Sequence, residues 1–400
     1  MRRIMVATAL SVLVIAAAIF IPSSPGHAAP PPKPTPTVTT TVTQTVTQTV
    51  TQTVTAPPQT VTTTVTVTPP PVPVPVPSHI RIAVMLIHFA GDTNEPWSPA
   101  FIDGLFDGPA PSTADFYSQS SWGQLTVTSD TFGWFSTTAT GCQITTMQNQ
   151  ADAAATAAGV DLTAYTHRAY VFYNTACSFS GNAGINWNTA NYNLNPSRCS
   201  ATACPVGARN TFFHELGHNL GLNHAASYIC TEGGVHVVYS ATCTTNQYGD
   251  QFDSMGCCAT RMMSNLNRLR LGWIPMSQVV TVDTTSTLTV TGAYNQDSLV
   301  YRVPLGDGTY LYLENRRQSV PIYDLTSSSS WPNGNLLIRR FGPLNDPYPF
   351  TQLCDGSPGD NDSIPNAKAL PIGAGFTAGG VTITNQAFDG TNNTVGVTFG

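Results

Sequence analysis

Three histidines at fixed spacing constrain this chain more than any other feature of its sequence. His214 and His218 are four residues apart, and His224 follows shortly after Gly221. Side chains four residues apart project from the same face of an α-helix, so the first two imidazoles can bind one metal ion. Glycine adopts positive φ without strain, so Gly221 can end the helix and return His224 toward the same ion. The spacing predicts a helix over 211–220 that leads into a three-histidine metal site.

The chemistry of such a site depends on Glu215, which directly follows the first histidine. Three neutral imidazoles are a typical ligand set for catalytic zinc, because they leave one coordination position for water. A carboxylate beside the ion can take a proton from water, so we interpret Glu215 as a general base and not as a ligand. The remaining histidines lack this spacing and are interpreted as ordinary core or surface residues: His27, His79, His88, His167 and His236.

The segment from His214 to His224 resembles the elongated zinc motif of the metzincin metallopeptidases. The stretch Tyr248–Gly256 resembles the Met-turn of the same clan. Within the clan the chain is most similar to the gametolysin family, with a weaker likeness to immune inhibitor A-type peptidases. The likeness extends over about 78–400 and is greatest at the zinc motif. The resemblance implies that Met255 lies beneath the zinc ion as a hydrophobic floor and is not a ligand.

Two positions depart from the metzincin pattern. Ala225 follows the third histidine, where several metzincin families carry a polar or charged residue. Cys257 stands two positions after Met255, where some families have a tyrosine that donates to the transition state. Tyr248 is the candidate substitute for this donor. Latency by a cysteine switch is not expected, because no cysteine precedes Cys142.

The first residues of the chain predict export from the cytoplasm. Arg2 and Arg3 precede an apolar run over 4–21, and the small residues of 26–29 follow. This is the layout of a secretory signal peptide, with cleavage expected after Ala28. The apolar run is also long enough to cross a bilayer, so a retained N-terminal anchor at the cell surface is the alternative. A secreted protein is the preferred interpretation.

Residues 29–77 form a low-complexity tract in which Thr-Val-Thr-Gln repeats precede alternating Val and Pro. The tract lacks aromatic and large aliphatic side chains that could form a core, so a disordered spacer is expected. Two roles stay open for it. It is either a stalk that holds the folded part away from the cell envelope or matrix, or an inert tail that proteases remove.

The composition fits an extracellular protein without a nucleic-acid partner. Charged residues make up only 10% of the chain, the net charge is −6, and no basic stripe is present. Nine cysteines are expected to form disulfides in an oxidising compartment, and their odd number leaves one over. Two pairs are close enough in sequence to close small loops near the metal motif: Cys199 with Cys204, and Cys230 with Cys243.

The distribution of apolar and turn residues predicts an α+β protein with two folded domains. Over 78–275, apolar runs alternate with helix-forming segments, which predicts a mixed sheet packed with helices. The resemblance identifies this part as a metzincin-like zinc protease domain that contains the active-site helix. Over 276–400, short runs of Thr, Val and Leu lie between turn residues, which predicts a β-sandwich-like C-terminal domain. The signal peptide, over 1–28, and the spacer precede both domains.

The expected elements of the first domain are strands over 80–89, 124–128, 133–137 and 168–173 and helices over 112–120, 151–158, 211–220 and 260–271. The expected strands of the second domain lie over 279–290, 299–303, 310–314, 336–340, 381–384 and 394–399.

An acidic loop is the candidate site for a second metal. Asp355, Asp360 and Asp362 are clustered there, and clustered carboxylates suit calcium, Ca²⁺. The spacing is not that of an EF-hand, and a solvated turn is the preferred interpretation. Asp250 and Asp253 are left open in the same way.

These features together predict a secreted zinc endopeptidase that hydrolyses peptide bonds of extracellular proteins or glycoproteins. One alternative is a non-catalytic surface adhesion module with a degenerate protease domain, which the intact set of His214, Glu215, His218 and His224 disfavours. A zinc hydrolase of non-peptide substrates is the second alternative. The sequence does not predict the cleavage specificity or the oligomeric state.

Overall fold

The computed structural model describes residues 77–200, 202–256, 261–293, 295–316, 323–324, 333–342, 350–359 and 368–400. The predicted signal peptide and nearly all of the predicted spacer lie outside these residues, as do Cys257, Asp360 and Asp362. Within the described part of the chain, no helix is both long and apolar enough to span a bilayer.

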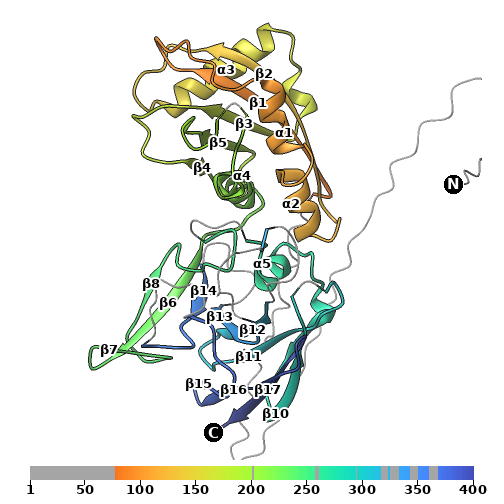
Figure 1. Ribbon diagram of the computed structural model, residues 1–400, viewed down its shortest axis with the longest axis vertical. Helices are drawn as coiled ribbons and strands as arrows, with labels where there is room; N and C mark the ends of the chain where they lie inside the picture. The colour runs from red at the N-terminus through yellow and green to blue at the C-terminus, as the bar shows by residue number, and fades with distance from the viewer. Residues whose placement is uncertain are drawn as a thin grey trace, which may run out of the picture. The chain divides into compact units, whose positions relative to one another are not determined.

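The first of the sheets contains β1 (His79–His88), with the strand order β2-β1-β3-β5-β4 (Figure 1). β1 pairs in parallel with β2 (Thr126–Ser136) and with β3 (His167–Phe172). β3 pairs in parallel with β5 (Thr189–Asn193), and β4 (Gly181–Ala183) is an antiparallel edge strand. The last seven residues of β1 are all buried, which is typical of a strand covered on both faces.

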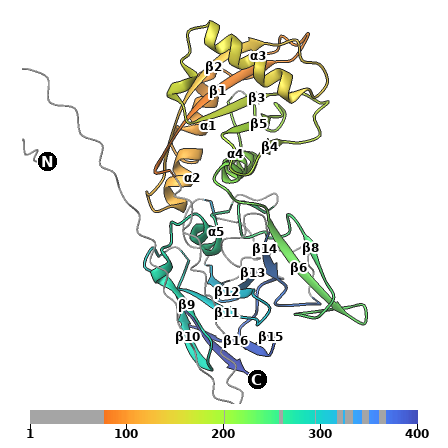
Figure 2. The same cartoon turned by 180° about the vertical axis from the view of Figure 1, so that it is seen from behind.

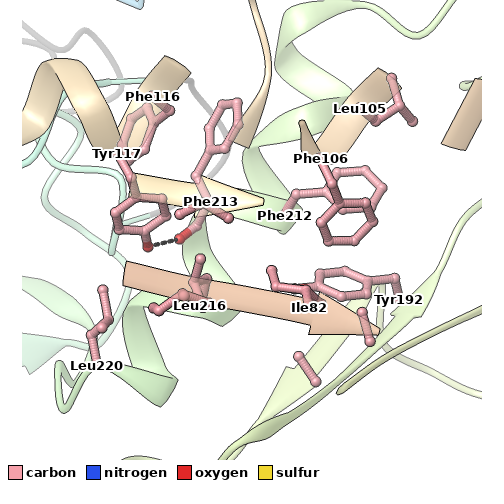
Figure 3. Close-up of a cluster of buried hydrophobic side chains, with 14 of the residues drawn as sticks. Ile82, Leu105, Phe106, Phe116, Tyr117, Tyr192, Phe212, Phe213, Leu216 and Leu220 are labelled. Carbon is pink, nitrogen blue, oxygen red and sulfur yellow. Dashed lines mark hydrogen bonds between the residues drawn. The ribbon is translucent and has the colours of Figure 1, made fainter. Parts of the chain in front are cut away.

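Helices cover both faces of this sheet. Ile82 and Val84 of β1 pack with α1 (Pro99–Phe106), α2 (Thr113–Ser120) and α4 (Val206–Asn219). Figure 3 shows this core, in which the Phe116 and Phe213 rings stack with centroids 4.4 Å apart. Ala83 and Met85, which alternate with them along β1, pack on the other face of the sheet with α3 (Ile144–Ala157). Because successive side chains of β1 point to opposite faces of the sheet, the strand contributes to two separate hydrophobic cores.

Two further sheets contain all the strands that follow α4 in the described part of the chain. One has the order β7-β6-β14-β13-β12-β11-β9, with β8 also paired to β6. The other has the order β10-β17-β16-β15. Figure 2 labels β10, β16 and β15 of this sheet. Side chains of both sheets form one buried cluster, which includes Leu313, Ile338, Phe376 and Val397. The C-terminal part is therefore rich in β-structure, and its two sheets share a core.

The strands of the larger sheet are β6 (Ala225–Glu232), β7 (Val235–Val237), β8 (Cys243–Asn246), β9 (Val279–Thr281), β11 (Val300–Pro304), β12 (Tyr310–Asn315), β13 (Leu336–Phe341) and β14 (Thr351–Cys354). The smaller sheet contains β10 (Ser286–Val290), β15 (Gly375–Ala378), β16 (Val381–Phe388) and β17 (Asn393–Phe399). The short helices are η1 (Leu162–Ala164), α5 (Asn265–Arg270) and η2 (Met276–Gln278).

Three strands of the larger sheet, β6, β7 and β8, come from the N-terminal side of the predicted domain boundary. β6 begins directly after His224, and it pairs in parallel with β14, with Ala225 opposite Thr351. The sheet therefore contains strands from before and after residue 275, although the two-domain division was expected at that position. This pairing brings the C-terminal part of the chain next to the third histidine.

Several element bounds differ from the sequence expectation for physical reasons. The two strands expected over 124–137 form the single strand β2, because Gly133 adopts a φ of +100° within the strand instead of ending it. The strand expected over 279–290 divides into β9 and β10, which belong to different sheets. The helix expected over 260–271 begins only at Asn265, where the Ser264 side chain accepts the Asn267 N–H as an N-cap.

Candidate metal centre

Helix α4 presents the first two histidines and ends where the spacing predicts. Phe213 and Leu216 are buried in the core and anchor the helix against the first sheet. The helix begins after Pro205, earlier than expected, and its C-cap residue is Leu220. Gly221 then has a φ of +100°, and its N–H donates to the His218 carbonyl at 2.9 Å. A residue with a side chain adopts this backbone only with strain, so the glycine allows the chain to reverse toward His224.

The structure brings His214, His218 and His224 together. One ligand atom from each ring lies within 4.8 Å of the corresponding atoms of the other two. The ring centroids are 4.7 Å apart for His214 and His218, 5.3 Å for His214 and His224, and 4.9 Å for His218 and His224. In the part of the chain that the structure describes, no other group of three His, Cys, Asp or Glu residues has this arrangement.

Hydrogen bonds fix two of the rings in the tautomer that a metal requires. The Nδ1 atom of His214 lies 3.0 Å from the Ser254 carbonyl oxygen, and that of His218 lies 2.8 Å from the Leu222 carbonyl oxygen. A carbonyl only accepts, so each Nδ1 carries the hydrogen and each Nε2 keeps its lone pair for the ion. The Nδ1 atom of His224 is buried without a hydrogen-bond partner among the described residues. An unsatisfied buried nitrogen is expected where a bound ion completes the site.

The protonation of the three rings also fits a metal. Burial lowers the pKa of His214 to about 3 and that of His224 to about 4, and it lowers the pKa of His218 as well. The rings are therefore neutral at neutral pH, and neutral imidazole is the form that binds a metal ion.

Glu215 lies against the edge strand β4 of the first sheet. Burial raises its pKa to about 8, while a hydrogen bond from the Ala183 backbone favours the ionised form. A Cβ atom on Gly181 would lie only 2.3 Å from Oε1 of Glu215, so the strand backbone approaches the carboxylate closely. Glu215 and His214 line a cavity of about 1190 Å³, and Tyr248 also lines it.

Met255 and Tyr248 both lie next to the histidines. Met255 is fully buried, and its Sδ atom would be 2.4 Å from a Cβ atom on Gly217, which precedes His218. Met255 therefore packs directly against the helical turn between the first two histidines. Tyr248 is 44% exposed, and its ring centroid lies 4.0 Å from that of His224. Burial raises the pKa of the Tyr248 hydroxyl, so this group keeps its proton at neutral pH.

Residues that the sequence analysis missed also approach the site. The ring of Phe350 is nearly parallel to that of His224, with centroids 6.3 Å apart. Gln247 also lies beside the His224 side chain. Phe350 reaches the site because it immediately precedes β14, and no local sequence pattern signals a contact over such a separation.

Asp250 and Asp253, which the sequence left open as calcium ligands, have other partners. Oδ2 of Asp250 lies 2.6 Å from Nε of Arg339. The carboxylate of Asp253 accepts the N–H groups of Met255 and Ser264, each at 2.8 Å. Asp355 is buried, while Asp360 and Asp362 lie outside the described residues.

Within the described residues, disulfides join Cys142 with Cys177, Cys199 with Cys204, and Cys230 with Cys243. The latter two are the pairs that sequence proximity suggested. Cys354 is buried and forms no disulfide with a described cysteine.

Comparison with known protein families matches part of this region. A model described as metallo-peptidase family M12B, reprolysin-like, matches residues 124–225. The matched segment ends one residue after His224, so it includes all three histidines and Glu215. The match supports a metallopeptidase. Metallopeptidases of this kind imply a zinc cofactor, which agrees with the three-histidine group.

Other comparisons add little. No curated protein matches the chain. The solved structures that match include a chain described as "Structure of a chaperone-substrate complex", with 12% identity and a TM-score of 0.25. The match covers 48% of the present chain and only 30% of the other. A likeness at this TM-score carries no argument about fold or function.

Proposed function

We propose that the protein is a secreted zinc endopeptidase of the gametolysin-like metzincin type, which hydrolyses extracellular proteins or glycoproteins. The observation that carries the proposal is that three neutral imidazoles each bring one ligand atom within 4.8 Å of the other two, beside a buried glutamate. His214, His218 and His224 would hold the zinc ion. When bound, zinc supplies Lewis-acid chemistry, acidifying water and polarising the carbonyl of the scissile bond.

Glu215 supplies the proton transfers of the proposed reaction. Its carboxylate accepts a proton from the attacking water and then delivers that proton to the leaving amine. The Ala183 N–H favours the ionised, proton-accepting form of the carboxylate. The close approach of Gly181 restricts its position, since a strand backbone does not yield as a flexible side chain does.

The edge strand β4 favours a peptide over a non-peptide substrate. β4 pairs only with β5 among the described strands, and Gly181 of β4 lines the cavity together with Glu215. An edge strand offers unpaired backbone groups to an extended peptide, which can pair as an additional strand. This arrangement would place a backbone carbonyl of the substrate beside the histidines.

We propose Tyr248 as the hydrogen-bond donor to the transition state. Its protonated hydroxyl is on a ring that contacts His224 and lines the cavity. Replacement of Tyr248 by Phe is expected to lower kcat while KM changes little, because the lost bond forms only in the transition state. Steady-state kinetics on one peptide substrate would test this role, and an unchanged kcat would exclude it.

Secretion is supported by the disulfides between described residues, since disulfides persist in oxidising compartments. The predicted signal peptide, with its alternative as an anchor, belongs to the same proposal.

Incubation of the mature protein with a denatured protein substrate tests the activity. We expect cleavage that a chelator abolishes and added zinc restores. Absence of cleavage by a zinc-loaded sample would favour an adhesion module or a hydrolase of another substrate class. Cleavage that persists after complete removal of metal would contradict the zinc mechanism.

A further inference from the structure

A buried network of charged side chains lies between the Met-turn segment, residues 248–256, and strands β12 and β13. Nε of Arg339, on β13, lies 2.6 Å from Oδ2 of Asp250, and its Nη2 atom lies 3.4 Å from Oδ1. Arg339 also forms an ion pair with Glu314, on β12. All three side chains are at most 3% exposed. This forked contact fixes direction as well as distance, as bidentate arginine–carboxylate pairs do.

Arg316 extends the network to the backbone of the same segment. Its guanidinium lies 3.1 Å from Oε1 of Glu314. It donates to the carbonyl oxygens of Phe252, Met262 at 3.2 Å and Met263 at 3.0 Å. The C-terminal strands and the residue after β12 thus hold the Met-turn segment both through a side chain and through its backbone.

The Met-turn segment in turn contacts each part of the candidate zinc site. The Ser254 carbonyl holds Nδ1 of His214. Met255 packs against Gly217, next to His218. The Ala225 N–H donates to the Met255 carbonyl at 2.8 Å, and the Asp250 N–H donates to the Ala225 carbonyl at 3.1 Å. Because Ala225 directly follows His224, these two bonds determine where the third ligand enters the site.

Burying these charged side chains costs free energy, because each loses the water that would solvate it. The sandwich already has an apolar core on the opposite face of β12 and β13, formed by side chains such as Leu313 and Ile338. Apolar packing is not directional, whereas the arginine contacts specify the position of one loop.

We infer that Arg339 is a positioning residue of the metal centre: through Asp250 it holds the Met-turn segment, and thereby His214 and His224, in the geometry that binds zinc. The inference rests on the proposed function in taking zinc as the ion. It makes the C-terminal β domain a part of the metal centre and not a separate module.

The test compares two lysine variants of the full mature chain. Arg339→Lys keeps the positive charge but loses the fork that contacts Asp250 and Glu314. Arg340→Lys makes the same chemical change at the next position, where the guanidinium lies 3.0 Å from Asp307, which is half-exposed. Zinc affinity is measured by competition with a chromogenic chelator, and ligand geometry by the visible spectrum of the cobalt-substituted protein. Circular dichroism first establishes a temperature at which each variant is folded.

For Arg339→Lys we expect zinc affinity to fall by up to about 10–100-fold, the cost of losing an outer partner of a metal ligand, because the Ser254 carbonyl that holds His214 would shift with the segment; the cobalt spectrum should change as well. For Arg340→Lys we expect the zinc affinity and the cobalt spectrum to match those of the wild type. An Arg339→Lys protein that unfolds at a lower temperature but has wild-type affinity and cobalt spectrum would overturn the inference. Equal losses in both variants would also overturn it.

Asp250→Asn provides a second variant if Arg339→Lys does not fold. Asparagine keeps the acceptor for the Phe252 N–H, which donates to Oδ1 at 2.8 Å, but removes the charge that pairs with Arg339. The same loss of zinc affinity is expected, and wild-type affinity would refute the inference. Peptide cleavage is assayed in parallel. Zinc binding without cleavage by the wild type would disprove the proposed function alone, whereas failure of the wild type to bind zinc would disprove both.

Discussion

Glu215 combines two requirements that oppose each other at the level of a single residue. The carboxylate is buried, and burial raises its pKa to about 8, yet a general base must be ionised to accept a proton. A cation close to a carboxylate favours the ionised form. Zinc binding and the function of Glu215 as a base are therefore coupled in the proposed mechanism.

Replacement of Glu215 by Gln tests this role. The amide is similar in shape but cannot accept the proton, so kcat is expected to fall by about 10²–10⁴-fold. The zinc content is expected to stay unchanged, because Glu215 is not among the three candidate ligands. Peptide kinetics and metal analysis of the same sample check both statements. A variant that turns over at nearly the wild-type rate would show that Glu215 is not the base.

His167 allows a prediction about stability that is independent of the metal site. Burial lowers its pKa to about 4, whereas an unfolded histidine titrates near 6.5. Between these pH values the unfolded chain binds a proton at this position and the folded chain does not. Stability therefore falls as the pH falls from about 6.5 to about 4.

A His167→Gln variant removes this contribution. Unfolding is measured with denaturant in the presence of a chelator. Over that pH window the free energy of unfolding of the variant should change less with pH than that of the wild type, and the difference in slope should correspond to at most about one bound proton. Identical slopes for the variant and the wild type would contradict the assignment.

At the scale of elements, the site depends on a close approach between α4 and the edge strand β4. Gly181 lacks a side chain where a Cβ atom would lie 2.3 Å from Oε1 of Glu215 and 2.5 Å from Cγ2 of Thr211. The strand and the helix can therefore meet only at a residue without a side chain.

A Gly181→Ala variant is expected to displace the Glu215 carboxylate while leaving the histidines in place. A displacement of about 1 Å can cost about 10²-fold in rate, so kcat should fall strongly with zinc content retained. Gly104→Ala, in α1, is the matched control, because a Cβ atom there has no neighbour within 4 Å and Gly104 does not line the cavity beside Glu215. The prediction fails if both variants keep wild-type kcat.

Elements with a strong local pattern could be predicted from the sequence, and others could not. β1 has a long apolar run, and α4 carries the histidine spacing, so both were anticipated with bounds off by one to several residues. β4 has only the residues Gly181, Asn182 and Ala183, which show no strand pattern. It is a strand because β5 lies beside it, and such pairing depends on the tertiary structure.

Some residues of the candidate site could likewise be predicted from local sequence, whereas others could not. The three histidines, Glu215 and Gly221 lie within eleven residues of sequence, so local geometry alone indicated that they could share an ion. Phe350 and Arg339 are remote in sequence from the histidines. The sheet that joins β6 to β14 and β13 brings Phe350 beside His224 and Arg339 beside Asp250. The contribution of the C-terminal part could therefore be recognised only from the fold.

For the whole molecule, the larger sheet joins the strand that follows the third histidine to strands from the C-terminal part. β6 has β14 as its parallel partner, and Asp250 has Arg339 as its counterion. The two predicted domains therefore share a sheet and a buried ion network. They are expected to fold together and not independently.

A chain that ends at Pro275 tests this dependence. It would leave β6 without β14 and would leave the buried carboxylate of Asp250 without its arginine, and a lone buried charge is strongly destabilising. We expect this chain to show no cooperative unfolding transition and no stoichiometric zinc binding, as measured by calorimetry and metal analysis. A soluble, zinc-binding product would show that residues 78–275 form an autonomous domain.

X-ray absorption spectroscopy at the zinc edge, on the full mature protein, would show directly which atoms hold the ion. One zinc ion per chain is expected, with three imidazole nitrogens at about 2.0–2.1 Å and one oxygen ligand, from water, completing the shell. A zinc shell that contains sulfur, or fewer than three imidazoles, would contradict the claim that His214, His218 and His224 together hold the ion.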